Sequence, residues 1–155
     1  MVAPRTRDVS WDEFYELWSD FLEDLHRAGT IVVVEGERDR ASLEKLGVRA
    51  PIRLVHGGRT LARLAESLSG PGHRVVVLTD WDGEGGHLAQ RLKEFLGHGE
   101  IVLDLDFRRR LAHVVRGEIV HVEGLAGWVR RLAEREGTSI EVFRRGRDTT
   151  PDATE

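Results

Sequence analysis

The side chains best suited to chemistry in this chain are carboxylates that follow two apolar runs. Glu35 directly follows one run, and Asp80, Asp82 and Glu84 come just after another. Because residues i and i+2 of an extended chain project to the same side, the carboxylates of Asp80 and Asp82 can converge on one hard cation. Ligands of open parallel sheets bind at the carboxyl ends of the strands, so Glu35 can contribute to the same site as Asp80 and Asp82. The pattern predicts a magnesium site, also open to Mn²⁺, with metal ligands Asp80, Asp82, Glu84 and Glu35.

Such a site would support metal-assisted phosphoryl transfer. The cation would neutralise a scissile phosphodiester and orient the attacking and leaving oxygens. We predict Glu35, Asp80 and Asp82 as the catalytic residues, with Glu35 moving a proton if it is not itself a ligand. A simpler alternative is that the aspartates only cap the helix that follows them, as acidic turns at strand ends commonly do.

Glycines beside these acids predict contacts with phosphate. Gly83 and Gly85 follow the aspartates and Gly36 follows Glu35, so the backbone at these points can approach an anion closely. Arg59 lies in a turn after another apolar run, so we expect it at the same edge of the sheet as Glu35 and Asp80. We predict that these four residues bind phosphate, although an ordinary tight turn also explains the sequence around Arg59.

Charge is divided unevenly along a chain whose formal net charge is -4. Residues 1–106 have a balance of -6, whereas residues 107–147 have a balance of +5 and include Arg108, Arg109 and Arg110. Arginines that neutralise phosphates release counterions whatever the base sequence, so we predict this run as a nucleic-acid contact. The alternative is a solvated helix face. The seven histidines show no paired ligand spacing and are interpreted as surface or packing residues, with phosphate contact as an alternative for His56 and His87.

The elements that must position these side chains alternate between strand and helix. Short apolar runs, each followed by a turn and a helical stretch, are typical of a parallel sheet covered on both faces. The predicted strands are Thr30–Glu35, Ile52–Val55, Arg74–Asp80 and Ile101–Asp104, and the helices between them are Asp39–Leu46, Thr60–Leu68 and Glu84–Leu96. Farther on, we expect a helix over Phe107–Val115, a short strand over Ile119–Val122 and a helix over Leu125–Glu136. The predicted fold class is therefore α/β, with a mainly parallel sheet of about four strands.

An amphipathic helix is expected before the first strand, within residues 10–28. Ser10 and Glu13 have the spacing of a capping box. Apolar residues then recur at steps of three and four, namely Trp11, Phe14, Tyr15, Trp18, Phe21, Leu22 and Leu25. We expect this aromatic face to pack on the sheet as core.

Length and composition favour a single domain. The 155 residues divide into an arm over residues 1–9, one domain over 10–145 with its core at 30–106 and an arginine-rich extension at 107–145, and a disordered tail over 146–155. The absence of cysteine excludes disulfides, thiolate catalysis and zinc ribbons. Apolar runs are too short to cross a bilayer, so we expect a cytoplasmic protein with no membrane partner.

The segments around the two acidic clusters resemble the Toprim domain. The similarity lies in Val33-Val34-Glu35-Gly36 with Asp39, and in Leu78-Thr79-Asp80-Trp81-Asp82-Gly83-Glu84-Gly85. The chain is similar to small stand-alone primase-like Toprim proteins, which include the bacterial 5S ribosomal RNA maturation nuclease and archaeal relatives. This resemblance implies a Rossmann-like four-stranded sheet, with Glu35 as general acid or base and Asp80 and Asp82 as magnesium ligands. Glu84 matches a third acidic residue of the topoisomerase form.

Several activities are compatible with the predicted site, and the residues favour a nuclease. A topoisomerase needs a tyrosine nucleophile on a further domain, whereas the only tyrosine, Tyr15, lies on the apolar helix. A nuclease needs only a metal, water and a surface that holds a polyanion. The alternatives are a non-catalytic Toprim module that binds nucleic acid or a processing complex, and primase-like nucleotidyl transfer. The expected partner is RNA or DNA, with RNA slightly favoured by the resemblance alone, and a protein partner or homodimer is left open.

Overall fold

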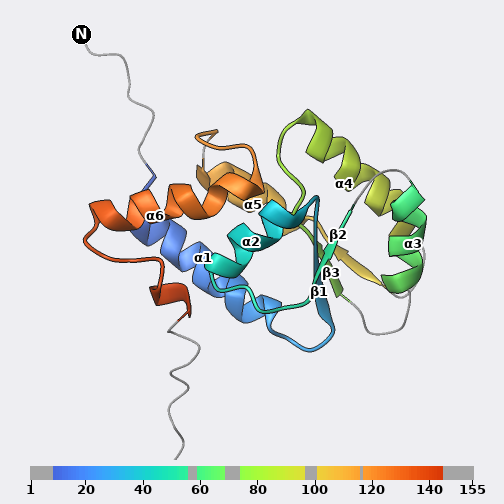
Figure 1. Ribbon diagram of the computed structural model, residues 1–155, viewed down its shortest axis with the longest axis horizontal. Helices are drawn as coiled ribbons and strands as arrows, with labels where there is room; N and C mark the ends of the chain where they lie inside the picture. Colours follow the sequence, from blue (N-terminus) through green and yellow to red (C-terminus); the bar gives the residue numbers. More distant parts are fainter. Residues whose placement is uncertain (1–8, 56–58, 69–73, 97–100, 116, 145–155) are drawn as a thin grey trace, which may run out of the picture.

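A four-stranded, all-parallel sheet forms the centre of the computed structural model, which describes residues 9–55, 59–68, 74–96, 101–115 and 117–144 (Figure 1). The strand order is β2-β1-β3-β4. The strands are β1 (Thr30–Val34), β2 (Ile52–Leu54), β3 (Arg74–Val77) and β4 (Val102–Asp104). The expected α/β fold class and its four parallel strands are confirmed.

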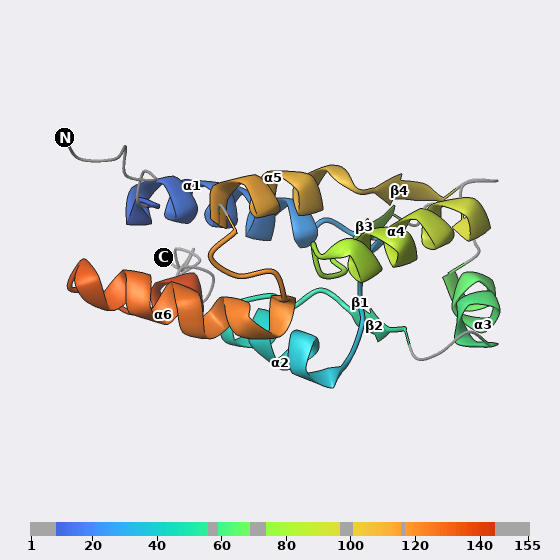
Figure 2. The same cartoon turned by 90° about the horizontal axis from the view of Figure 1, so that it is seen from above.

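Helices cover both faces of this sheet, as expected for strands that are apolar on both sides (Figure 2). The helices are α1 (Trp11–Leu25), α2 (Glu37–Lys45), α3 (Arg59–Leu68), α4 (Gly83–Leu96), α5 (Asp106–Val115), the short 3₁₀ helix η1 (Val122–Gly124) and α6 (Leu125–Arg135). Alternate side chains of β1 point to opposite faces of the sheet, so Val32 packs into one core and Ile31 into the other.

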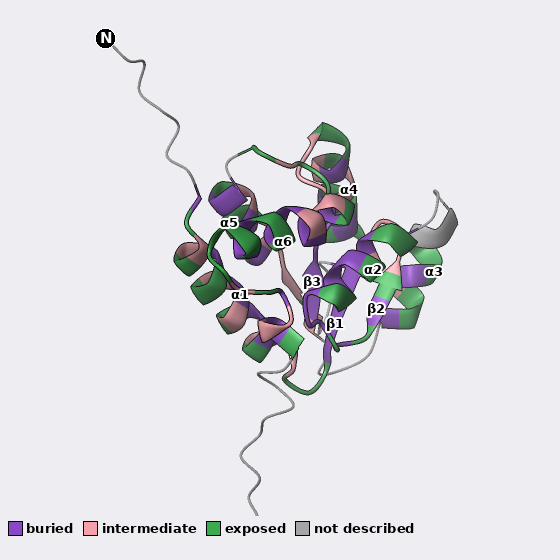
Figure 3. Ribbon diagram, turned by 60° about the vertical axis from the view of Figure 1, so that its left-hand side comes forward, coloured by how far each residue is buried: buried purple, intermediate pink, exposed green. Residues whose placement is uncertain are grey.

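The two cores differ in composition. The aromatic core lies between the sheet and helices α1, α2, α5 and α6, and it contains the buried aromatics Phe14, Trp18, Phe21, Phe107, Trp128 and Phe143. The aliphatic core lies between the sheet and helices α3 and α4, and its buried side chains are all aliphatic. The buried surfaces of the helices face inward and their exposed surfaces face outward around the sheet (Figure 3).

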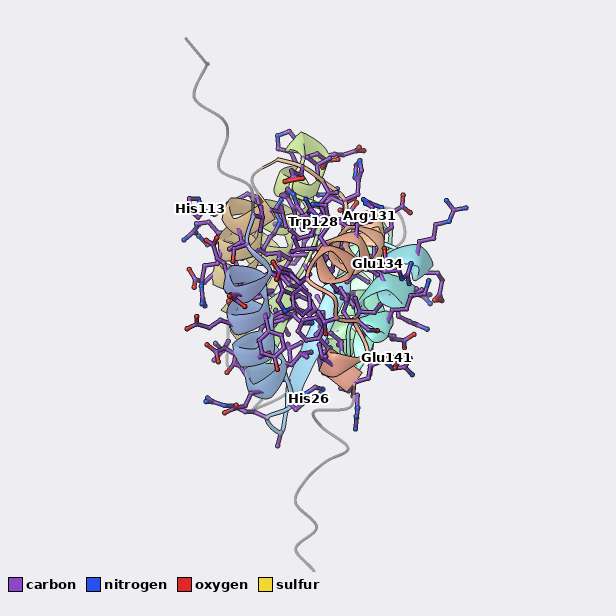
Figure 4. The ribbon with its side chains drawn as sticks, turned by 90° about the vertical axis from the view of Figure 1, so that its left-hand side faces the viewer. His26, His113, Trp128, Arg131, Glu134 and Glu141 are labelled. Carbon is purple, nitrogen blue, oxygen red and sulfur yellow. The ribbon has the colours of Figure 1, made fainter. Side chains whose placement is uncertain are left out.

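Helix α1 is the amphipathic helix predicted from the aromatic stripe. Its N-cap is Ser10, whose side chain accepts a hydrogen bond from the Glu13 N–H at 3.2 Å. Trp18 is fully buried and donates its indole N–H to the Leu46 carbonyl at 2.8 Å. Figure 4 shows Trp128 among the side chains between α1 and α6, with Arg131 and Glu134 on the outer side of α6. The prediction that this helix packs as core is confirmed.

An ionic contact ties α1 to the sheet. Arg74, at the start of β3, donates through Nη2 to Asp24 of α1 and to Asp104 of β4, the latter at 2.6 Å. Asp104 also accepts the Asp106 N–H at 2.9 Å, so it caps α5. Asp104 and Asp106 have the same spacing as Asp80 and Asp82, but Asp104 has a structural role at the end of β4.

The predicted strand over Ile119–Val122 is wrong. Residues 119–121 have no regular secondary structure and lead directly into η1. Instead of joining a ladder, this segment binds the loop after β3: the Trp81 N–H donates to the Val120 carbonyl at 3.0 Å and the Trp81 indole N–H donates to the Ile119 carbonyl at 2.6 Å. Contacts with one loop replace the repeated backbone pairing that a strand requires.

Other predicted elements are present with slightly different ends. The strand expected over Arg74–Asp80 ends at Val77, and the one expected over Ile101–Asp104 begins at Val102. Of the arm predicted over residues 1–9, only Val9 is described, and the tail predicted over residues 146–155 lies outside the described residues. Among the helices of the described residues, none combines the length and the apolar character that crossing a membrane requires.

Candidate functional site

The two acidic clusters lie at the carboxyl edge of the sheet, after the neighbouring strands β1 and β3. Backbone contacts continue past the strands, because the Leu78 N–H donates to the Val33 carbonyl at 2.8 Å. Beyond this contact, the Glu35 Oε2 atom accepts the Asp80 N–H at 2.7 Å. The side chain of one cluster thus holds the backbone of the other, which brings the predicted catalytic residues together.

Asp80 is the centre of the site, with a side chain that is 15% exposed. Its Oδ1 atom accepts the Val122 N–H at 2.7 Å, and its Oδ2 atom lies 3.0 Å from Nδ1 of His121. The same imidazole nitrogen lies 3.7 Å from Oδ2 of Asp82. Asp80, Asp82 and His121 each offer a ligand atom, and these atoms lie within 4.8 Å of one another. Two carboxylates and one imidazole at this spacing suit a divalent cation.

His121 is the member of this group that the sequence did not reveal. It lies 41 residues after Asp80, and the nearest other histidine in the sequence, His113, is eight residues earlier. Its position depends on the segment before η1, which was expected to be a strand. No local signal identifies it, because the contact is made by the fold and not by a motif.

Asp82 also caps a helix, as the alternative interpretation of the acidic turn predicts. Its Oδ1 atom accepts the Gly85 N–H at 2.7 Å, which caps the first turn of α4, while its Oδ2 atom faces His121. Thr79 strengthens this turn, since its hydroxyl donates to the Gly85 carbonyl at 2.8 Å. Capping and metal ligation are therefore compatible, because they use different oxygens of one carboxylate.

The glycines of the site differ in how much space surrounds them. A Cβ atom built on Gly85 would lie 1.8 Å from the Asp80 carbonyl oxygen, so this position excludes any larger residue. Its N–H is already bound to Asp82, whereas the N–H of Gly36 is bound to Asp39 at 3.0 Å. Gly83 has open space where a Cβ would lie. Close packing of the loop is the structural reason for Gly85.

Glu84 is exposed in the first turn of α4. Within the described residues, the group with metal-ligand spacing contains His121 and not Glu84. Arg59 begins α3, and its side chain lies outside what the structure describes. Ligation by Glu84 and phosphate binding by Arg59 stay predictions.

The arginine run of α5 divides into one inward and two outward side chains. Arg108 is half-buried and donates its Nε–H to the Thr79 carbonyl at 2.9 Å and its Nη2–H to the Asp80 carbonyl. Burial lowers its pKa, against the nearby charges of Glu35, Asp82 and Asp80. Arg109 and Arg110 are exposed and lie 3.6 Å and 3.9 Å from Asp106 oxygens. Arg108 therefore braces the loop that carries Asp80.

The local electrostatics favour a bound cation. Burial raises the pKa of Glu35, and repulsion from Asp80, Asp39 and Asp82 adds to the shift. Burial likewise raises the pKa of Asp39, with a further contribution from Asp80. The hydrogen bond to Asp80 raises the pKa of His121, so a proton on this imidazole competes with a metal ion for the same acids. A divalent cation between Asp80 and Asp82 would relieve the repulsion among these acids, so the donor set fits such an ion.

The sequence of this chain matches a known protein family. The sequence matches the Toprim domain over residues 30–122, which spans the sheet, the acidic loops and His121. The chain belongs to the Toprim domain family. Toprim domains bind divalent metal ions through acidic residues and have functions related to nucleic acid, and the Asp80, Asp82 and His121 group of this Toprim protein agrees with that property.

Relatives of this Toprim protein are small proteins of similar extent. A UPF0292 protein of Methanosarcina barkeri is 34% identical over 122 residues, 79% of this chain and 84% of its own. A UPF0292 protein of Pyrococcus furiosus is 35% identical over 115 residues, 74% of this chain and 86% of its own. A solved structure, a putative protein from Aquifex aeolicus, matches with a TM-score of 0.58 and 28% identity over 70% of this chain and 94% of its own. The resemblance to small Toprim proteins is confirmed.

Proposed function

We propose that this protein is a Mg²⁺-dependent phosphoryl-transfer enzyme acting on nucleic acid, and specifically a small nuclease. The observation that carries the proposal is the convergence of Asp80, Asp82 and His121, with Glu35 bound to the Asp80 backbone. These groups come from three separate segments, and acids gathered at this edge repel one another unless a cation is bound. The proposal extends the metal-binding and nucleic-acid-related function of Toprim domains to a particular reaction.

Each residue has a distinct part in the proposed reaction. Asp80 and Asp82 would hold the cation, and the exposed imidazole of His121 would complete the donor set. When bound, the metal supplies charge neutralisation at the phosphate and activation of water. Glu35 is a proton carrier at its carboxyl oxygens, in agreement with the role that the family resemblance implies. Arg108 is a positioning residue, because its guanidinium fixes the carbonyls of Thr79 and Asp80.

The other Toprim activities have less support. Tyr15 lies on α1 and stacks on Phe143 with ring centroids 5.5 Å apart, within the aromatic packing of that helix. This position does not support a tyrosine nucleophile of the topoisomerase type. Primase-like transfer and a non-catalytic binding module remain the alternatives. RNA is the first substrate to test, because of the similarity to the ribosomal RNA maturation nuclease.

The test is cleavage of end-labelled single-stranded and structured RNA and DNA in Mg²⁺ or Mn²⁺. Wild type is compared with Glu35→Gln and Asp80→Asn, and with Glu94→Gln as a control on the exposed part of α4. We expect cleavage by the wild type and the control, and a loss of about 100-fold or more in the two site variants. Binding without cleavage, equal in all four proteins, would favour the non-catalytic module and overturn the nuclease proposal.

A further inference from the structure

A surface groove lies between α2 and the segment formed by η1 and α6, which run side by side (Figure 2). Its lining includes three cations and one acid, namely Arg38, Lys45, Arg130 and Glu123, and several small residues, among them Ala41 and Gly127. This α2–α6 groove is separate from the arginine run of α5 that the sequence singled out. Its two walls come from distant parts of the chain, since α2 ends at Lys45 and η1 begins at Val122, so only the fold brings them together.

Both walls place small residues between larger charged ones. On α2, Arg38, Ala41 and Lys45 follow at steps of three and four residues, so they share one face of the helix. The two cations are seven residues apart, or roughly 10 Å along the helix axis. On the other wall, Glu123, Gly127 and Arg130 follow the same kind of spacing. Because Ala41 and Gly127 are small, the charged side chains border a hollow instead of filling it.

The three cations of the groove are free to bind an anion. Arg38, Lys45 and Arg130 are all exposed. Across the described ranges of the chain, none of their side chains forms an ion pair or a hydrogen bond. By contrast, Arg109 and Arg110 face Asp106, and the guanidinium of Arg108 is bound to two carbonyls. The groove therefore offers more available positive charge than the arginine run does.

Direct contacts connect the groove to the acidic site. The Ser42 hydroxyl oxygen accepts the Ala126 N–H at 2.9 Å in a buried position, which holds the start of α6 against α2. At the near end, Val122 donates its N–H to Asp80, and Glu123 of the groove follows it. Arg38 lies three residues after Glu35 on the other wall. The groove thus opens beside the carboxylates, with its acidic side chain nearest them and Lys45 and Arg130 farther away.

We propose that the α2–α6 groove binds the phosphate backbone of a nucleic-acid strand and leads that strand to Asp80 and Asp82. This inference rests on the proposed function, since the groove would hold the substrate of that same site. Exposed, unpaired cations along a groove suit sequence-independent contact with successive phosphates. The described residues that line the groove include no aromatic side chain for base stacking, so we expect contacts with the phosphate backbone.

The test is the affinity for short fluorescent RNA and DNA strands, measured by anisotropy in EDTA across a series of salt concentrations. The triple variant Arg38→Gln, Lys45→Gln, Arg130→Gln is compared with a matched control, Arg63→Gln, Arg91→Gln, Lys93→Gln, whose exposed residues lie on α3 and α4. For the groove variant we expect at least about a tenfold loss of affinity and a salt slope reduced by about 2 to 3. The control removes the same charge and should change neither quantity appreciably.

A second pair of variants separates charge from shape. Ala41→Glu places an acid between the two cations of α2, and Ala41→Gln adds a side chain of the same size without charge. We expect Ala41→Glu to weaken binding clearly more than Ala41→Gln, and circular dichroism to give the same fold for both.

The outcomes separate this inference from the proposed nuclease activity. No binding by the wild type, equal losses in the groove and control triples, or no loss in either, would overturn the groove. Groove-dependent binding without metal-dependent cleavage would support the groove and overturn the nuclease. Cleavage that depends on Asp80 but is unchanged in the groove triple would support the nuclease and overturn the groove.

Discussion

The two faces of the sheet are built from different side chains and serve the site differently. The aliphatic core beneath α3 and α4 packs Val, Leu and Ile, whereas the aromatic core beneath α1, α2, α5 and α6 contains the buried Phe and Trp side chains of the described residues. The segments that complete the site continue from the aromatic core: Phe107 precedes Arg108, and Val122 follows His121. The aromatic core therefore both stabilises the fold and supports Arg108 and His121 beside the acids.

The largest expected effect is on the aromatic core itself. Trp18→Ala removes a fully buried indole that stacks near Phe14 and leaves the Leu46 carbonyl without its partner. We expect the free energy of unfolding to fall by about 3–5 kcal/mol in urea denaturation. Leu68→Ala, in the aliphatic core, removes a smaller side chain and no hydrogen bond, so it should lower the free energy of unfolding by less, within a range of about 2–5 kcal/mol. An equal or larger loss in Leu68→Ala would contradict the difference between the faces.

The next effect concerns the loop that joins the aliphatic face to the site. Gly85→Ala places a Cβ against the Asp80 backbone, so we expect a loss of about 1–3 kcal/mol in stability and weaker metal binding. Gly83→Ala, where the corresponding space is open, should change stability by less than about 1 kcal/mol. Urea denaturation and Mn²⁺ titration measure the two effects. Equal behaviour of the two variants would argue against the close contact between Gly85 and Asp80.

His121→Ala tests the difference between the two faces, because it removes the candidate ligand that follows from the aromatic side of the fold. We expect the affinity for Mn²⁺ to fall by about 10- to 100-fold in isothermal titration, with little change in the free energy of unfolding of the metal-free protein. His113→Ala, on the exposed side of α5, is the control. Unchanged affinity in His121→Ala would mean that the carboxylates bind the ion without the imidazole.

The smallest effect is a pH dependence at the start of α2. Burial raises the pKa of Asp39 above 3.8, and Asp80 raises it further, so the folded state holds this proton to higher pH than the unfolded state. The contribution of Asp39 to the free energy of unfolding therefore falls as pH rises from about 4 through the folded pKa, and stays low above it. Asp39→Asn keeps an acceptor for the Gly36 N–H but removes this decline.

Urea denaturation in EDTA between pH 3.5 and pH 7 measures the Asp39 effect. The stability of Asp39→Asn relative to wild type should increase with pH over this range. A relative stability that stays constant, or that decreases with pH, would contradict the raised pKa.

Much of the architecture follows from local patterns along the chain. The apolar runs before Glu35 and Asp80 are long enough and branched enough to form buried parallel strands, and the fold places both acids at one edge of the sheet. The aromatic stripe of α1 has a period that only a helix satisfies. The apolar residues of the segment over residues 119–122 predict a strand, whereas in the fold its backbone groups bind Trp81 and Asp80.

By itself, the sequence determined the four strands of the sheet, the helices between them, the family, and the place of Glu35, Asp80 and Asp82, because these depend on neighbours only a few residues away. The tertiary structure decided that His121 joins the aspartates, that Arg108 braces their loop, and that α2 and α6 form a groove. Each of these contacts joins residues 28 to 84 positions apart. Spacing along the chain carries no periodic signal for such pairs, since their distance is set by how the helices pack on the sheet.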